Sequence, residues 1–213
     1  MQVGVLGSGV VAKTLASGFL KHGYAAMLGS RSPEKLADWA AENPTGKTGT
    51  FAEAAAFGDV VVLAVKGTVA ADALRLAGAK NLKGKPLMDA TNPIEEAPPV
   101  NGVLQFFTGV NDSLMERLQK EFAEAHLVKA FNSVGSAHMI DPEFAGGKPT
   151  MFLCGNDTGA KKTVTGIVEE FGWEAADMGG AGAAGAIEAL CVLWCIPGFR
   201  ENKWNHAFKL LKK

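Results

Sequence analysis

The stretch Val3-Gly4-Val5-Leu6-Gly7-Ser8-Gly9-Val10-Val11-Ala12 decides the fold of this chain. Its first four residues are a short apolar run, typical of a buried strand. Residues 10–22 then follow a helical periodicity, which Gly23 ends. The turn between strand and helix has the spacing G-x-G-x-x-A, and in that context the spacing indicates a dinucleotide-binding fold.

Each position of that turn has a physical reason. The first glycine permits a tight turn, the second lets the backbone approach a pyrophosphate, and the small third residue lets helix and strand pack closely. The N-terminus of the helix attracts the anion. We therefore expect the cofactor phosphates on Gly7, Ser8, Gly9, Val10 and Val11. The alternative is an ordinary tight turn between a strand and a helix.

Strands alternate with helices along most of the remaining sequence. Further strands are predicted at 24–28, 48–51, 59–65, 86–90, 127–131, 150–154 and 174–178, and helices at 32–42, 52–57, 69–77, 113–124, 137–144 and 158–171. Residues 94–110 are rich in proline, glycine and polar side chains and are predicted to form a loop. The alternation predicts an α/β fold, a Rossmann-type doubly wound and mostly parallel sheet.

The end of the chain differs from this pattern. We expect residues 1–180 to form the Rossmann domain and residues 181–213 a short helical extension packed on it. An apolar helix at 183–196 is expected to stop before Pro197, too short to span a bilayer. An amphipathic segment at 203–211 should follow, with Lys209, Lys212 and Lys213 at a solvated helix end. Because the helix at 183–196 is apolar on nearly all sides, we expect the chain to form a homodimer through this helix.

Composition excludes several classes of function. The 213 residues carry 21 basic and 22 acidic side chains without basic clustering, so nothing favours nucleic acid or an anionic membrane as a partner. No basic segment followed by an apolar one opens the chain, which disfavours a secretory leader. Three cysteines in no framework spacing indicate a reducing compartment, so we expect a cytoplasmic protein. Cys191 and Cys195 share a helical face, but without further ligands they are interpreted as buried small side chains rather than a metal or redox pair, and no metal site is predicted.

The residues after the second predicted strand indicate whether the cofactor is NAD or NADP. NAD-selective folds usually carry an acid there, about 20 residues beyond the turn. This chain instead has Gly29-Ser30-Arg31-Ser32. Arg31 offers a charged, planar fork for a 2′-phosphate, the Ser30 hydroxyl can donate to it, and Lys35 adds a charge. This pattern predicts NADP; the alternative is a pair of surface cations beside a helix start.

Three later strand ends carry polar or small residues, and ligands of parallel sheets bind at such ends. They are Val65-Lys66-Gly67, Thr91-Asn92-Pro93 and Asn132-Ser133-Val134-Gly135-Ser136. Asn92 and Asn132 are the candidate catalytic residues, as donors to a nicotinamide amide or to a carbonyl of an acceptor ring. Val65, Lys66, Gly67 and Ser136 are candidate cofactor contacts, and His138 is a candidate acid. Each of these residues also has a plainer interpretation, as a turn, cap or exposed residue.

Taken together, these motifs resemble the coenzyme F420-dependent NADP oxidoreductases and their bacterial dinucleotide-binding relatives. The resemblance extends over nearly the whole chain through GSGVVA at 7–12, GSRSPEK at 29–35, VVLAVKG at 61–67, DATNP at 89–93, KAFNSVGS at 129–136, FLCGND at 152–157 and AIEALCVLW at 186–194. The family is also similar to the reductase domain of the STEAP metalloreductases. F420-using archaeal members carry His where this chain has Asn132, and a proline-containing turn where it has Gly135.

The resemblance implies NADPH on the first turn, with Ser30, Arg31 and Lys35 around the 2′-phosphate. It implies a flavin-like or F420-like deazaflavin ring near the strand ends at 65–67 and 132–136. The function predicted is an NADP(H)-dependent oxidoreductase that passes hydride between NADPH and a second ring cofactor or a small acceptor. Two alternatives stay open, a non-catalytic NADPH-binding or sensing module and a small reductase of the 6-phosphogluconate dehydrogenase kind. Few residues follow Thr150, which disfavours the latter because it needs a large second helical domain.

Overall fold

One eight-stranded sheet organises the chain in a computed structural model, which describes residues 1–109 and 111–213. Its strand order is β3-β2-β1-β4-β5-β6-β7-β8. The strands are β1 (Gln2–Leu6), β2 (Ala25–Gly29), β3 (Lys47–Gly49), β4 (Val60–Leu63), β5 (Pro86–Asp89), β6 (His126–Lys129), β7 (Thr150–Gly155) and β8 (Glu174–Asp177). Neighbouring strands run parallel except β6 and β7, which pair antiparallel over two residue pairs. The predicted mostly parallel Rossmann-type sheet is confirmed.

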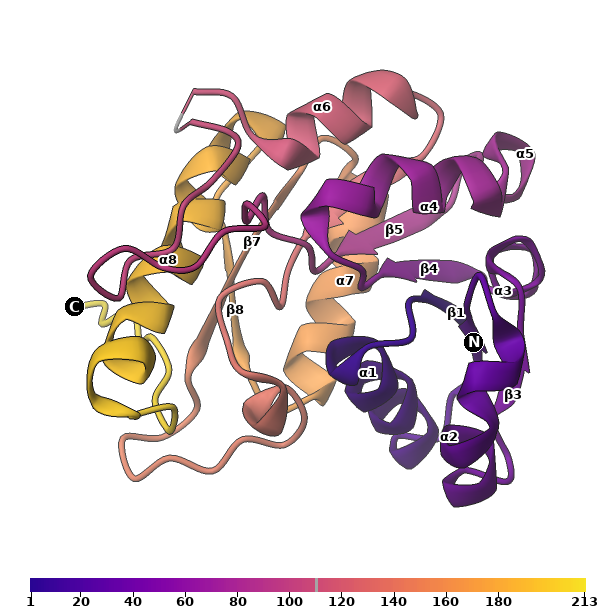
Figure 1. The fold of residues 1–213 in the computed structure, drawn as a ribbon, viewed down its shortest axis with the longest axis horizontal. Helices are drawn as coiled ribbons and strands as arrows, with labels where there is room; N and C mark the ends of the chain where they lie inside the picture. The colour runs from indigo at the N-terminus through magenta and orange to yellow at the C-terminus, as the bar shows by residue number, and fades with distance from the viewer. Residues whose placement is uncertain (110) are drawn as a thin grey trace.

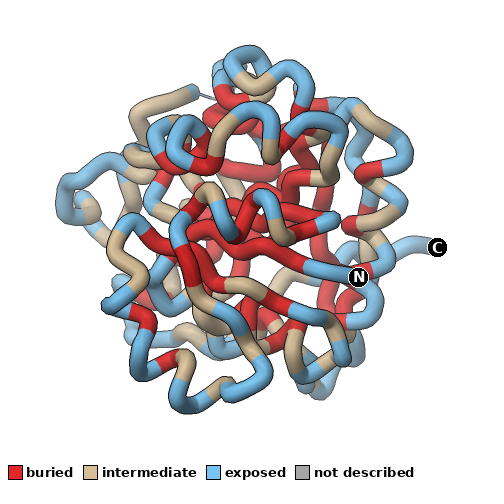
Figure 2. The backbone as a smooth tube through the Cα atoms, turned by 90° about the vertical axis from the view of Figure 1, so that its right-hand side faces the viewer, coloured by how far each residue is buried: buried red, intermediate tan, exposed pale blue. Residues whose placement is uncertain are grey.

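Helices cover both faces of the sheet (Figure 1). The helices are α1 (Val10–Lys21), α2 (Ala37–Glu42), α3 (Phe51–Phe57), α4 (Ala70–Ala77), α5 (Ala79–Leu82), α6 (Leu114–Glu121), α7 (Thr158–Glu170) and α8 (Ala184–Glu201). The apolar sides of α1, α2 and α7 pack on one face, and those of α3, α4 and α6 on the other. Figure 2 shows the result, with buried backbone through the middle of the molecule and exposed backbone around it.

The long loop predicted at 94–110 is present in its described part. Residues 94–109 contain no helix or named strand, only isolated bridges such as Ile94 with Phe106, and Val110 lies outside the described residues. The predicted helix at 137–144 is reduced to a 3-10 turn at Ser136–His138.

Three predictions about residues 183–213 are wrong, two of which concern helix α8. Helix α8 does not stop before Pro197 but continues to Glu201 and ends where Asn202 takes a left-handed conformation. Proline removes the hydrogen bond to the residue four positions earlier and crowds its carbonyl, and that residue, Leu193, is exposed, so water can solvate the freed carbonyl. The prediction that this helix is too short to span a bilayer also fails. By length and composition alone, 181–201 could cross a membrane, although 44% of its most apolar window is buried inside the protein.

The amphipathic helix expected at 203–211 is absent, because residues 202–213 have no regular secondary structure. This segment instead folds back over α8 and the start of β7. The Trp194 indole nitrogen donates to the His206 carbonyl at 2.9 Å, and the Thr150 amide donates to the Phe208 carbonyl at 2.8 Å. Lys209 therefore pairs with Glu174 at 2.6 Å rather than ending a solvated helix. Tertiary contacts here outweigh the weak helical periodicity.

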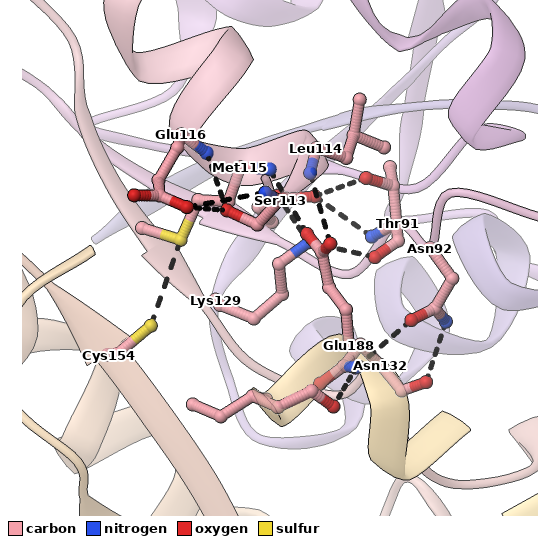
Figure 3. A network of polar contacts seen from close by, with 12 residues as sticks. Thr91, Asn92, Ser113, Leu114, Met115, Glu116, Lys129, Asn132, Cys154 and Glu188 are labelled. Atoms are coloured by element: carbon pink, nitrogen blue, oxygen red, sulfur yellow. Dashed lines mark hydrogen bonds and ion pairs between the residues drawn. The ribbon is translucent and has the colours of Figure 1, made fainter. Parts of the chain in front are cut away.

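A fully buried ion-pair network joins β5, β6, α6 and α8 (Figure 3). Asp89 and Lys129 are direct partners across β5 and β6. The Lys129 Nζ lies 2.7 Å from the Asp89 carboxylate and 2.9 Å from that of Glu188 on α8, and it donates to the Thr91 carbonyl at 2.9 Å.

The Glu188 carboxylate also accepts hydrogen bonds from the backbone at the start of α6. Its two oxygens accept from the amides of Leu114 and Met115, at 3.0 Å each. The positive end of the α6 dipole thus partly balances the negative charge of Glu188, the second carboxylate of the network. Burial by itself lowers the pKa of Lys129, but the Asp89 and Glu188 carboxylates outweigh it and raise that pKa above its usual value. Lys129 is therefore charged inside the core.

Removing this one cation should destabilise the protein strongly. We expect Lys129→Met to lower the free energy of unfolding by about 3–5 kcal/mol, because two buried carboxylates lose their counter-charge. Equilibrium unfolding in urea measures the change. The control is Lys83→Met, which removes an exposed pair with Glu124 and should leave the midpoint unchanged. Equal midpoints for the two variants would show that the network does not hold the core together.

Candidate functional site

The turn Gly7-Ser8-Gly9 uses its two glycines for different purposes. Gly7 has a φ of 147°, and a Cβ there would collide with the Ala64 carbonyl and lie 2.8 Å from the Ala12 Cβ. Gly7 therefore allows β1, β4 and α1 to pack closely. A Cβ on Gly9 would meet nothing within 4 Å, and Gly9 lines the adjoining cleft. The second glycine keeps an approach to the backbone open, as the motif requires.

Helix α1 presents its N-terminus to the same cleft. Its N-cap is Gly9, which provides no side-chain cap, and its first turn contains no acidic residue. The first amides of the helix are consequently free, and the side chain of Val10 is 65% exposed. Free amides and the positive end of the helix dipole form an anion site of the kind that holds pyrophosphate.

A cleft of about 710 Å³ extends from this turn between β2, β4 and α4. It brings together seven of the predicted cofactor residues: Gly7, Ser8, Gly9, Ser30, Arg31, Val65 and Lys66. Five others do not line it: Val10, Val11, Lys35, Gly67 and Ser136. The opposite wall, formed by Val69, Asp72, Ala73, Arg75 and Leu76 of the α4 region together with Phe51, was not predicted from the sequence. The exposed side chain of Leu76 is the feature that marks this wall as a binding surface, because an apolar part of a ligand would cover it.

Ser30 and Arg31 lie at one end of the cleft. Ser30 is buried, and its Oγ accepts from the Ser32 amide at 3.1 Å, which leaves the hydroxyl hydrogen available to donate. Arg31 is exposed and has no ion-pair partner within the described ranges. Lys35 is exposed nearby, in a 3-10 turn at Pro33–Leu36 that Ser32 precedes without a side-chain cap. An unpaired guanidinium beside a hydroxyl donor suits a phosphate monoester.

The two predicted catalytic asparagines meet at the ends of β5 and β6 (Figure 3). The Asn132 Nδ2 donates to the Asn92 Oδ1 at 3.0 Å and to the Ile187 carbonyl at 2.9 Å. In return the Asn92 Nδ2 donates to the Asn132 carbonyl at 2.7 Å. Asn132 is only 3% exposed and both of its N–H groups are used, so the expected donation from Asn132 to a ring is not available. Asn92 is half-buried and keeps one N–H free.

The backbone before Asn132 is strained. Phe131 has a φ of 59°, which is unusual for a bulky residue, and its side chain is fully buried against Phe171 and Trp173. Such strain persists only where packing enforces it, and it often accompanies functional sites. This strained conformation was not predicted from the sequence, because phenylalanine is not a residue type that favours a positive φ.

The turn after Asn132 packs under α8. A Cβ on Gly135 would lie 2.7 Å from the Trp194 Cη2, so the indole ring requires glycine there. Ser136 begins the short 3-10 turn. His138 contacts the Asn205 Oδ1 at 3.2 Å, and its ring packs against that of Phe144 in a tilted arrangement. In the described part of the chain, no hydrogen bond links His138 to either asparagine. The proposed acid is therefore separate from the amide pair.

The cysteines agree with their interpretation as small buried side chains. All three are buried and free, and burial raises the pKa of the Cys154 thiol to about 12. The hydrogen bond that the Cys191 thiol donates to Cys195, together with burial, raises the pKa of Cys191 as well. Within residues 1–109 and 111–213, no group of three metal-ligating side chains comes together.

Sheet order, turn and anion site together define a dinucleotide-binding Rossmann protein. Comparison with known proteins narrows this class. Residues 2–93 match the model of the family described as "NADP oxidoreductase coenzyme F420-dependent". A solved structure from Arthrobacter sp. FB24, provisionally named as an F420-dependent NADP reductase, is 32% identical with a TM-score of 0.93 over the whole of both chains. The chain belongs to this family, and NADP is its dinucleotide.

Two further relatives are more distant or longer. Metalloreductase STEAP3 of Rattus norvegicus is 32% identical over 190 residues, which cover 89% of this chain and 36% of STEAP3. The chain thus spans about a third of the length of that relative. The hypothetical protein SMa0349 of Sinorhizobium meliloti is 24% identical with a TM-score of 0.75, over 100% of this chain and 96% of its own, a likeness of fold.

Arg31 should decide the preference for NADPH. We expect wild-type protein to bind NADPH at least about tenfold more tightly than NADH, and Arg31→Ala to remove that advantage by losing a phosphate contact of about 1.5–3 kcal/mol. Lys35→Ala should have a smaller effect, because Lys35 does not line the cleft. Calorimetric titration of both cofactors provides the measurement. Equal losses for NADPH and NADH in Arg31→Ala would place the 2′-phosphate elsewhere.

Proposed function

We propose that this protein transfers hydride between NADPH and a second ring cofactor, either F420 or a flavin. The observation that carries the proposal is the chemistry of the strand ends beside the NADP cleft. The polar groups that meet there, Asn92 and Asn132, are amides rather than an acid–base pair. Hydride transfer between two rings needs orientation and exclusion of water more than proton transfer by the protein.

Each part of the site has a separate task in this proposal. The turn and the N-terminus of α1 hold the pyrophosphate, and Arg31 with Ser30 holds the 2′-phosphate. Asn92 uses its free N–H to orient a ring through a carbonyl. Asn132 acts as a positioning residue, because its bonds to Asn92 and to Ile187 fix the neighbouring amide. NADPH supplies the hydride itself when bound.

The acceptor is identified by mixing NADPH-loaded protein without oxygen in turn with F420, FMN, FAD and ferric chelates. Loss of NADPH absorbance with F420 or a flavin supports the proposal, and loss only with ferric chelates contradicts the ring acceptor. Tight NADPH binding with no turnover on any acceptor favours the alternative, a non-catalytic NADPH-binding or sensing module.

Asn92→Ala should lower turnover about ten- to a hundredfold by misorienting the ring, while NADPH affinity changes little. The matched control, His138→Ala, should retain turnover, and the rate should vary little between about pH 6 and 8 because amides do not titrate there. Steady-state kinetics of both variants across this pH range supply the data. A bell-shaped profile that disappears in His138→Ala would make His138 the acid and overturn the role of the amides.

We also propose that the chain forms a cytoplasmic homodimer through α8. The inner side of this helix is buried by Ile187, Cys191 and Trp194, yet Leu193 on its outer side and Phe199 in its last turn remain 55% and 45% exposed. A second copy of the same helix offers a matching apolar surface.

A charge on that surface should separate the subunits. We expect wild-type protein to have a dimer mass at micromolar concentration, and Leu193→Glu to have a monomer mass while its circular dichroism spectrum shows that the fold is retained. Light scattering distinguishes the two masses. A monomer mass for the wild type would exclude the dimer.

A further inference from the structure

A second cavity, of about 680 Å³, lies beside the cofactor cleft between α4, α6 and the long loop after β5. Its lining residues are Gly67, Thr68, Ala71, Glu95, Glu96, Ala97, Phe107, Leu114, Arg117, Leu118 and Glu121. Its volume falls in the range of small-molecule sites. None of the steps assigned above to NADPH or to hydride transfer uses it. Among the described residues, only Glu96 lines both this cavity and the cofactor cleft.

The interior of the cavity is apolar and contains an aromatic ring. Leu114 and Leu118 are nearly fully buried at its base, whereas Phe107 and Ala71 are only partly buried. The Arg117 guanidinium lies 6.0 Å from the centre of the Phe107 ring. Such a surface accepts the face of a planar or aromatic ligand.

The charges around the cavity are mostly negative. Three of its lining residues are glutamates, against one arginine. Arg117 is neutralised by Asp112, with its Nε 2.9 Å from the Asp112 Oδ1. Because Arg117 is already paired with Asp112, which does not line the cavity, its charge would attract an anionic ligand only weakly.

The glutamates are not equally compensated. Glu121 accepts from Arg75 at 2.7 Å, and Glu96 pairs with Lys66 at 3.2 Å. Glu95 has no ion-pair partner in the described ranges. The cavity therefore combines an apolar, aromatic interior with an uncompensated carboxylate at its edge, which suits a ligand that is both aromatic and cationic.

The pair of Lys66 and Glu96 connects this cavity with the cofactor cleft. Lys66 lines the cleft, and Glu96 lines both spaces. Both side chains are largely exposed, so their pairing is weak and easily exchanged. Cofactor phosphates in the cleft would draw Lys66 toward themselves. Glu96 would then lose its partner and add a second uncompensated carboxylate to the cavity.

We propose that this cavity is a second binding site, for a planar aromatic cation, and that NADP(H) in the adjacent cleft strengthens binding there through Lys66 and Glu96. The coupling is reciprocal, so the aromatic cation also tightens the cofactor. The strengthening depends on the binding of NADP(H) in the cleft but not on the identity of the hydride acceptor.

Proflavine, a planar fluorescent cation, tests the proposal in the full-length protein, with the anion 1-anilinonaphthalene-8-sulfonate for comparison. We expect one proflavine to bind per chain, more tightly than the sulfonate, and saturating NADP⁺ to tighten proflavine about two- to fivefold. Fluorescence titration gives both affinities without requiring turnover, so failure of the proposed hydride transfer does not affect the result.

Variants locate the site. Glu95→Gln should weaken proflavine about three- to tenfold, whereas the control Glu34→Gln, an exposed residue outside the cavity, should not. Ala71→Phe should fill the cavity and abolish binding, with circular dichroism checking that the fold is retained. Lys66→Met leaves Glu96 without its partner from the start, so it should bind proflavine as tightly as the NADP⁺-loaded wild type and lose the effect of NADP⁺. If NADP⁺ displaces proflavine, or if Glu95→Gln and Ala71→Phe both bind like the wild type, the cavity is not the site and the proposal is wrong.

Discussion

A lysine charge in the middle of the core determines how the later parts of this molecule are arranged. Lys129 on β6 needs two carboxylates, and they come from β5 and from α8, elements far apart in the sequence. Glu188 also needs the free amides at the start of α6. Four elements therefore meet at one buried point. A buried network of this kind specifies an arrangement more than it adds stability, because desolvation offsets much of its attraction.

The candidate site depends on the same point. Because Glu188 fixes α8, the neighbouring Ile187 carbonyl reaches Asn132, and Trp194 two turns later covers Gly135. The ends of β5 and β6 are thus shaped by a helix that contributes no residue to the cofactor cleft. The nucleotide end of the site is independent of it, since Gly7 packs within the first half of the sheet and Gly9 faces the cleft.

Sequence patterns predicted the sheet well because the apolar runs that mark its strands are local information. The glycine spacing and Arg31 are local signals too, and the structure brings Gly7, Gly9 and Arg31 to one cleft, while the position of the phosphates there stays a prediction. The Asp89–Lys129 pair was missed. Charged residues in otherwise apolar strands were a visible signal, but the hydrophobic pattern of a sequence does not show which strands are neighbours in the sheet. The helix through Pro197 and the irregular segment 202–213 were missed for a related reason. Contacts of Trp194 with His206 and of Thr150 with Phe208, distant in sequence, decide them.

The position of Glu188 also has a consequence for the order in which the chain folds. It lies 74 residues after Leu114, whose amide it accepts. A chain emerging from the ribosome thus completes β5, β6 and α6 long before their last carboxylate exists. Until α8 arrives, the amides that begin α6 have no acceptor from Glu188, and one bond of Lys129 is missing. Closing contacts over such long separations is slow. We therefore expect the native packing of the second half of the sheet to form late in folding, once α8 supplies Glu188.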